Sequence, residues 1–179
     1  CNGDTVVDEC GECGGDGIAD GACDCEGNIE DECGICGGDG SSCDNNEPPA
    51  EFQYNTSTLQ AFYLFNFVTI DGVPVDSDDW VGAFKCNQWY NDECVDLGDC
   101  IGSRQWGACS DEEGCDVPVF GNDGSEYTQG YILSGEIPAF QIYDVSSDAY
   151  FPAQASDIVP WVYLEYPIID NLNSSGDVV

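Results

Sequence analysis

The sequence predicts a mainly β protein, a β-sandwich preceded by an irregular, disulfide-rich arm that contains two repeats. All Trp, Tyr and Phe residues lie after position 50, whereas eight of the 13 cysteines lie in the first 46 residues. The later part alternates short apolar runs with Asp-Gly, Gly-Asn and Ser-Gly turn signals, and no stretch keeps a helical period. We therefore expect a repeat arm at 1–46, a linker at 47–52 and a β-sandwich at 53–179.

The arm contains one ten-residue unit written twice. Residues 8–17 (DECGECGGDG) and 31–40 (DECGICGGDG) agree at nine of ten positions. With a C-x-G prelude and a closing cysteine, each unit owns four cysteines, which are Cys1, Cys10, Cys13 and Cys23 in the first and Cys25, Cys33, Cys36 and Cys43 in the second. Because the arm has too few apolar residues to bury a core, it needs covalent bridges or metal.

Two bridges in each unit would supply that stability. A bridge that closes on the order of 10–15 residues contributes roughly 3 kcal/mol. Four cysteines allow three pairings, and the sequence does not choose among them, although a bond between Cys10 and Cys13 would close only with strain. The paired C-x-x-C motifs also match a zinc or iron ribbon, or a redox pair, but a ribbon would leave two cysteines of each unit unused.

The cysteine content favours an oxidising compartment, so we expect an extracellular or cell-surface protein. The chain has no Met, no signal-type segment and no apolar run long enough for membrane insertion. We therefore expect a processed product or a part of a larger secreted polypeptide.

The chain is strongly acidic, with 36 Asp and Glu residues against only Lys85 and Arg104, and its formal net charge is −34. This charge excludes nucleic acid and anionic membranes as partners. Bound Ca²⁺ would relieve the repulsion, since Ca²⁺ prefers oxygen ligands and the chain has no His. The candidate ligands are Asp8, Asp16, Asp20, Asp24, Asp31, Asp39, Asp76 and Asp78. Because no EF-hand loop is present, the open alternative is that these carboxylates cap turns or stay solvated.

The motif C-G-x-C-G-G-D-G-S-S-C at Cys33–Cys43 resembles the end of the cysteine-rich domain of ADAMTS-type secreted metalloproteases. It is also similar to acidic, repeated C-G-x-C-G-G-D modules of secreted bacterial proteins. The resemblance covers about a quarter of the chain and implies a disulfide-bonded extracellular spacer. It brings no catalytic residues, because the protease motif H-E-x-x-H cannot occur in a chain without His.

The prolines Pro48 and Pro49 end the arm and favour an extended link. The run at 59–70 (LQAFYLFNFVTI) is apolar on nearly both faces and predicts a central strand of the sandwich. Seven further short strands complete the prediction, and they span residues 80–84, 101–106, 117–120, 131–133, 139–143, 150–153 and 159–166.

Three elements of the second part, at 78–84 (DDWVGAF), 100–104 (CIGSR) and 135–144 (GEIPAFQIYD), resemble small β-sandwich modules in secreted proteins of marine and Bacteroidetes-type bacteria. The resemblance spans most of residues 59–153 and implies architecture and an extracellular setting, with no defined chemistry. This chain departs from the pattern through an insertion at 86–99, which we expect to be a loop closed by Cys86 and Cys94.

An odd number of cysteines then remains, namely Cys100, Cys109 and Cys115. One of them is free and buried, bonded to another chain, or paired with the arm. Arg104 is expected to have an internal carboxylate partner in so acidic a chain. Asn122, Asp123 and Glu126 place further oxygens on a turn.

The ligand candidates of the second part are aromatic. Trp89 and Tyr90 lie in the insertion and could stack on sugar rings, whereas Trp80, Trp106 and Trp161 are expected to pack in the core or to make a protein contact. Asn55 and Asn173 fit the N-x-S/T glycosylation pattern.

No combination of residues points to catalysis, because the chain lacks His, a Ser-base pair and a phosphate loop. The sequence therefore predicts a non-enzymatic extracellular structural protein. We expect a disulfide- and Ca²⁺-stabilised subunit that self-associates into a surface fibre or matrix. The alternative is a carbohydrate-binding or adhesion module cut from a larger secreted protein.

Overall fold

The computed structural model describes the residues 7–11, 13–15, 17–19, 21–29, 36–37, 47–108 and 115–175. The chain divides into two compact units, Cys1–Asn46 and Glu47–Val179. The boundary lies at the expected end of the repeats. Residues 47–52, expected to form a separate linker, belong to the second unit.

The second unit is mainly β, as the sequence predicts. Its strands are β1 (Gln60–Ile70), β2 (Val73–Pro74), β3 (Trp80–Tyr90), β4 (Glu93–Gln105), β5 (Cys115–Phe120), β6 (Pro138–Asp144), β7 (Ala149–Ala155) and β8 (Ile168–Ser174). Its short 3-10 helices are η2 (Ala50–Phe52), η3 (Trp106–Ala108) and η4 (Glu126–Thr128). No helix in the described part of the chain is long and apolar enough to span a membrane.

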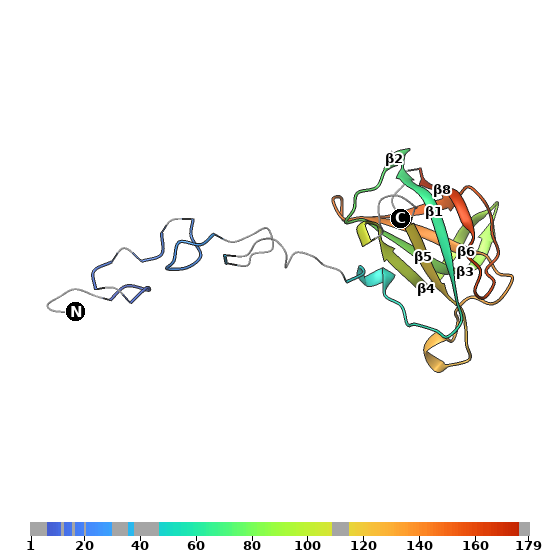
Figure 1. Ribbon diagram of the computed structural model, residues 1–179, viewed down its shortest axis with the longest axis horizontal. Helices are drawn as coiled ribbons and strands as arrows, with labels where there is room; N and C mark the ends of the chain where they lie inside the picture. The colour runs from blue at the N-terminus through green and yellow to red at the C-terminus, as the bar shows by residue number, and fades with distance from the viewer. Residues whose placement is uncertain are drawn as a thin grey trace. The chain divides into compact units, whose positions relative to one another are not determined.

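The strands form one continuous sheet that folds over on itself. Their order is β2-β1-β8-β7-β6-β3-β4, and β5 also pairs with β1. Figure 1 labels each of these strands except β7. The β1–β8 pair is parallel, and the other pairs are antiparallel. Strand β7 pairs with β6 up to Ala153 and with β8 at Gln154 and Ala155. The change of partner along β7 divides the sheet into two layers, one containing β1, β5 and β8 and the other containing β3, β4 and β6. The two layers together form a β-sandwich.

Aromatic side chains fill the space between the two layers. Tyr63 and Phe65 of β1 are buried, and their ring centroids lie 5.7 and 5.1 Å from that of Phe140 on β6. Their neighbours Phe62 and Leu64 point to the outer face and stay partly exposed. Strand β1 is therefore central, as predicted, but only one of its apolar faces lies in the core.

Strands β4 and β5 pack against each other where the two layers meet at one side. Arg104 of β4 makes two contacts with Asp116 of β5. Its Nε donates to the Asp116 carbonyl oxygen at 2.9 Å, and its Nη2 lies 2.9 Å from the Asp116 Oδ2. The expected carboxylate partner of Arg104 is thus confirmed. Gly102 of β4 comes so close to β5 that a Cβ there would lie 1.8 Å from the Pro118 carbonyl oxygen.

Two of the expected strands are absent from the sheet. Residues 131–133 form only an isolated bridge between Ile132 and Gly121. Residues 159–166 form an irregular segment, in which Trp161 is buried over Gly121 and donates from Nε1 to the Val119 carbonyl oxygen at 3.0 Å. The last strand is β8, which sequence reasoning did not predict, and the short β2 was missed as well.

Phe52 explains why the linker prediction was wrong. Its side chain is fully buried, and its ring lies 5.4 Å from Phe84 and 5.6 Å from Tyr150. The hydroxyl of Ser103 on β4 donates to the Phe52 carbonyl oxygen at 3.0 Å. Residues 50–52 are therefore a packed part of the sandwich, even though the prolines before them suggest an extended link.

The described part of the arm has no apolar core, as its composition predicts. Val7, Ile18 and Ile29 are 51%, 37% and 69% exposed. An isolated bridge pairs Val7 with Cys13, and no described arm residue lies in a strand or helix. Disulfides and turns must therefore hold this unit.

Candidate functional site

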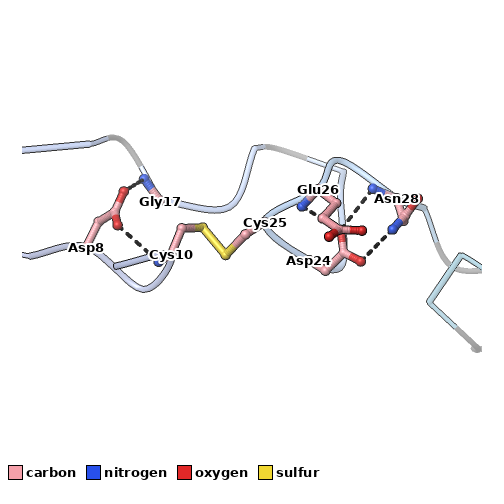
Figure 2. The surroundings of a disulfide bond; sticks show 7 residues. All are labelled: Asp8, Cys10, Gly17, Asp24, Cys25, Glu26 and Asn28. Carbon is pink, nitrogen blue, oxygen red and sulfur yellow. Dashed lines mark hydrogen bonds between the residues drawn. A yellow bond between two sulfur atoms is a disulfide. The ribbon is translucent and has the colours of Figure 1, made fainter. Parts of the chain in front are cut away.

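The arm's described disulfides join the two repeats. Cys10 is bonded to Cys25 across 15 residues, and Cys23 is bonded to Cys36 across 13 (Figure 2 shows the first bridge). Both bridges cross from the first unit to the second, so the expectation of two bridges inside each unit was wrong. The predicted absence of a Cys10–Cys13 bond is confirmed. Cys1, Cys33 and Cys43 lie outside the described residues.

This pairing also removes the metal-ribbon alternative. Such a ribbon would need both C-x-x-C pairs as free thiolates. Cys10, Cys13 and Cys36 are all disulfide-bonded. The two repeats are therefore cross-linked to each other by disulfides.

Asp8 and Asp24 serve as acceptors for local turns (Figure 2). The Asp8 carboxylate accepts from the N–H groups of Cys10 and Gly17, each at 3.0 Å. Asp24 accepts from the Asn28 side-chain amide at 2.6 Å and from the N–H groups of Asn28 and Glu26 at 3.0 and 2.9 Å. The Asn28 bonds lower the pKa of Asp24. Both carboxylates thus take the turn-capping role that the sequence left open.

The other calcium candidates divide into two groups. Asp16, Asp20, Asp31 and Asp39 lie outside the described residues. Asp76 and Asp78 are exposed in the turn before β3. Among the residues that the structure describes, no three Asp, Glu or Cys side chains are close enough to hold one metal ion.

The buried carboxylate of that turn is Asp79, which is 4% exposed. Its Oδ2 accepts from the Asp76 N–H at 2.7 Å, and its Oδ1 accepts from the Val145 N–H at 2.9 Å. Burial raises the pKa of Asp79, and these two bonds oppose the shift. Asp79 thus fastens the turn before β3 to the turn after β6.

The insertion at 86–99 is a β-hairpin rather than the expected loop. Strands β3 and β4 continue through it with several register shifts, and the bond between Cys86 and Cys94 closes its tip. The turn residues Asn91 and Asp92 have φ angles of 51° and 64°, a conformation that these residue types tolerate. The bridge holds an exposed ribbon in one shape.

Trp89 and Tyr90 lie at this tip and are 40% and 65% exposed. They are consecutive residues of β3, paired with Cys94 and Glu93. Since consecutive strand residues point to opposite faces, the two rings cannot form one sugar-stacking platform. A ligand stacked on Trp89 would lie on the opposite face of the hairpin from Tyr90.

The two glycosylation candidates differ in accessibility. Asn55 is exposed, its N–H donates to the Tyr131 hydroxyl oxygen at 2.8 Å, and its Nδ2 donates to the Tyr127 carbonyl oxygen at 3.4 Å. Asn173 is partly buried in β8, where its Oδ1 accepts from the Thr69 hydroxyl at 2.7 Å. Asn55 is therefore the more accessible side chain.

Cys100 is the free thiol among the described cysteines, and it is buried. Cys115 is disulfide-bonded, and Cys109 lies outside the described residues. Burial raises the pKa of Cys100 to about 12, so the thiol stays protonated at neutral pH. A buried, protonated thiol is inert as a nucleophile.

A cavity of about 830 Å³ lies beside Cys100 and was not predicted. Its walls come from residues 50–51 and 53–55, the loop with Tyr127 and Tyr131, residues 97–100 of β4, and one residue each of β3, β6 and β7. Four Tyr, two acids and three side-chain amides line it, namely Tyr54, Tyr127, Tyr131, Tyr150, Glu51, Asp99, Gln53, Asn55 and Gln141. No motif joins these residues, so only the high Tyr content after position 50 hinted at such a site.

The fold and these sites define a disulfide-stapled, mainly β protein with an aromatic cavity in its second unit. Searches for related proteins match no family model, no curated protein and no solved structure.

Proposed function

We propose that this chain is a non-enzymatic structural protein of the extracellular space and a subunit of a surface fibre or matrix. The observation that carries the proposal is an uncovered apolar strip on the sandwich. The strip consists of Phe62 and Leu64 on β1 with Tyr166 and Ile168 beside them. Tyr166 and Ile168 are 58% and 70% exposed. Contiguous apolar surface of this kind is typical of protein contact sites.

The residues of the strip share one face. The rings of Phe62 and Tyr166 stack with centroids 5.4 Å apart and an interplanar angle of 8°. Ile168 is the register partner of Leu64 across the parallel β1–β8 pair, so both side chains leave the sheet on the same side. Tyr63 and Ile169 point inward and are buried. The outer face of β1 therefore offers an ordered surface for a second copy of the chain.

The disulfides support the extracellular part of the proposal, because such bonds persist where the environment is oxidising. The acidity supports a requirement for Ca²⁺, because two copies that each carry a formal charge of −34 repel each other. Lys85 and Arg104 are already counted in this charge, and each is paired with a carboxylate of its own chain, Lys85 with Glu136 and Arg104 with Asp116. Calcium bound between exposed carboxylates would allow the strips to meet.

Electron microscopy and sedimentation of the purified chain, with millimolar Ca²⁺ and with a chelator, test the proposal. We expect assemblies only with Ca²⁺. Ile168→Glu should prevent assembly because it places a charge in the strip. Leu133→Glu is the matched control, since Leu133 is 55% exposed outside the strip and should assemble normally. Monodisperse particles of 19.2 kDa under every condition would reject the fibre function.

The exposed Trp89 favours carbohydrate binding as a second candidate function. Aromatic rings stack on pyranose faces, and the Cys86–Cys94 bond preorders the hairpin that presents this ring. On a glycan array, Trp89→Ala should lose binding, whereas Tyr90→Ala, on the opposite face of the hairpin, should keep it. An array without any bound glycan would count against this candidate.

A further inference from the structure

We propose that the cavity beside Cys100 binds a small organic cation, with an alkylated ammonium group held among tyrosine rings and two carboxylates. The proposal concerns the second unit alone and does not rest on the fibre function. The volume of about 830 Å³ lies within the range typical of small-molecule sites, which is roughly 300–1,000 Å³.

The aromatic walls of the cavity are held in place by packing. Tyr54 stacks on Phe120, with ring centroids 5.4 Å apart and an interplanar angle of 24°. The ring of Tyr150 lies 4.7 Å from that of Tyr143. Tyr131 is only 5% exposed, and its hydroxyl oxygen accepts the Asn55 N–H at 2.8 Å. Rings fixed in this way can present their negative faces to a cation without a large ordering cost.

Tyr127 differs from the other three tyrosines because it is 68% exposed. It comes from η4, and the bond from Asn55 Nδ2 to its carbonyl oxygen at 3.4 Å links this loop to the segment at residues 53–55. Tyr127 therefore lies at the rim of the cavity, where it can be replaced without disturbing the core.

Two carboxylates give the cavity a negative charge, and neither Lys85 nor Arg104 forms an ion pair with them. Glu51 and Asp99 line the wall, whereas the chain's Lys and Arg are paired with Glu136 and Asp116. Both carboxylates act electrostatically on rings of the cavity. The charge of Glu51 adds to the effect of burial in raising the pKa of Tyr150, and the charge of Asp99 does the same for Tyr131. The positive charge of Arg104 opposes the effect of burial on the pKa of Tyr54, but the Arg104 guanidinium is hydrogen-bonded to the Asp116 carboxylate.

These features discriminate among ligand classes. An anion would meet Glu51, Asp99 and the field of a chain with a formal charge of −34. A neutral sugar could use the amides of Gln53, Asn55 and Gln141, but it would leave the carboxylates without a counter-ion. An alkylated ammonium group uses both the carboxylates and the aromatic faces, and it is less costly to desolvate than a primary amine.

The test is isothermal titration of the full chain with choline, compared with 3,3-dimethylbutan-1-ol, its neutral isostere. The two probes have nearly the same shape, so a difference in affinity reports the charge. We expect choline to bind at least about ten-fold more tightly, since the cation–aromatic and carboxylate contacts are absent for the isostere. Equal binding of the two probes, or no binding of choline at millimolar concentrations, would overturn the proposal.

Matched variants locate the site. Glu51→Gln combined with Asp99→Asn removes two charges from the cavity, and we expect about a ten-fold loss of choline affinity. Glu93→Gln combined with Asp92→Asn removes the same two charges from the exposed hairpin turn and should change the affinity less than about two-fold. Equal losses in both pairs would mean that choline responds only to the net charge, and this would reject a specific site.

The aromatic contribution is tested at the rim. Tyr127→Leu keeps an apolar side chain at an exposed position but removes the ring, so choline affinity should fall while the melting temperature stays unchanged. Choline affinity that is unaltered in Tyr127→Leu, Tyr54→Leu and Tyr150→Leu would exclude the aromatic part of the proposal. A neutral monosaccharide that binds more tightly than choline would assign the cavity to carbohydrate instead.

Discussion

Asp123 shows how this acidic chain uses single carboxylates at the residue scale. It accepts hydrogen bonds from the N–H and hydroxyl groups of Thr58, at 3.1 and 3.0 Å, from the Ser125 N–H at 3.1 Å and from the Thr128 hydroxyl at 2.7 Å. The segment before β1 is thereby tied to the loop after β5. Asp8, Asp24 and Asp79 serve their local backbone in the same manner, so many acids of this chain have structural partners.

The variant Asp123→Asn should reveal this role through the pH dependence of its thermal stability. The Thr58, Thr128 and Ser125 bonds hold the pKa of Asp123 well below its ordinary value. A carboxyl group with a lowered folded-state pKa stabilises the protein above its unfolded pKa, near 3.8, and this stabilisation is lost as the pH falls through the folded value. We expect Asp123→Asn to melt below the wild type at pH 7, with the difference narrowing below about pH 3.8.

Thermal melts of both proteins across this pH range make the measurement. Asp92→Asn is the control, because it removes the same charge from an exposed turn, and its difference from wild type should stay small at every pH. If Asp123→Asn melts below the wild type by the same amount at every pH, the charge of Asp123 contributes no stability.

At the scale of elements, residues 50–52 behave as part of the sandwich. Phe52 fills the space between Phe84 and Tyr150, and the Ser103 hydroxyl fixes the Phe52 carbonyl oxygen. The expected linker therefore closes one end of the core. It also places Glu51, Gln53 and Tyr54 on the wall of the cavity.

Phe52→Ala should lower the free energy of unfolding by roughly 3–5 kcal/mol, the usual cost of truncating a buried Phe. Phe67→Ala is the matched control, because Phe67 is 62% exposed on β1, and it should cost no more than about 0.5 kcal/mol. Urea unfolding followed by Trp fluorescence measures both. Equal costs for the two variants would mean that residues 50–52 act as a linker after all.

At the scale of the whole molecule, electrostatic repulsion adds to the conformational entropy that opposes folding. The formal net charge is −34, and both internal cations are paired with carboxylates. Repulsion of this size favours the expanded state, so screening ions or bound cations should stabilise the fold.

Melting temperatures in NaCl and in CaCl₂ at equal ionic strength separate screening from binding. Salt should raise the melting temperature under non-reducing conditions, and Ca²⁺ should raise it further if carboxylates bind the ion. Adding a chelator should then return it to the NaCl value. Identical values in the two salts would mean that the carboxylates are only a solvated surface.

The sequence by itself determined the features that depend on neighbouring residues. The apolar runs that became β1, β5 and β6, the boundary at Asn46 and the need for covalent staples in the arm all follow from local composition and spacing. The mainly β class follows from the same patterns, because short apolar runs and the turn residues between them are short-range signals.

Only the tertiary structure decided which distant residues meet. It joined the arm's repeats through Cys10–Cys25 and Cys23–Cys36, left Cys100 free, and replaced the expected strand at 159–166 with a segment anchored by Trp161. It also assembled the tyrosine-lined cavity from segments far apart in the chain. These outcomes depend on the pairing order of the strands, since packing and bridging select partners by distance in space and not by spacing in the sequence.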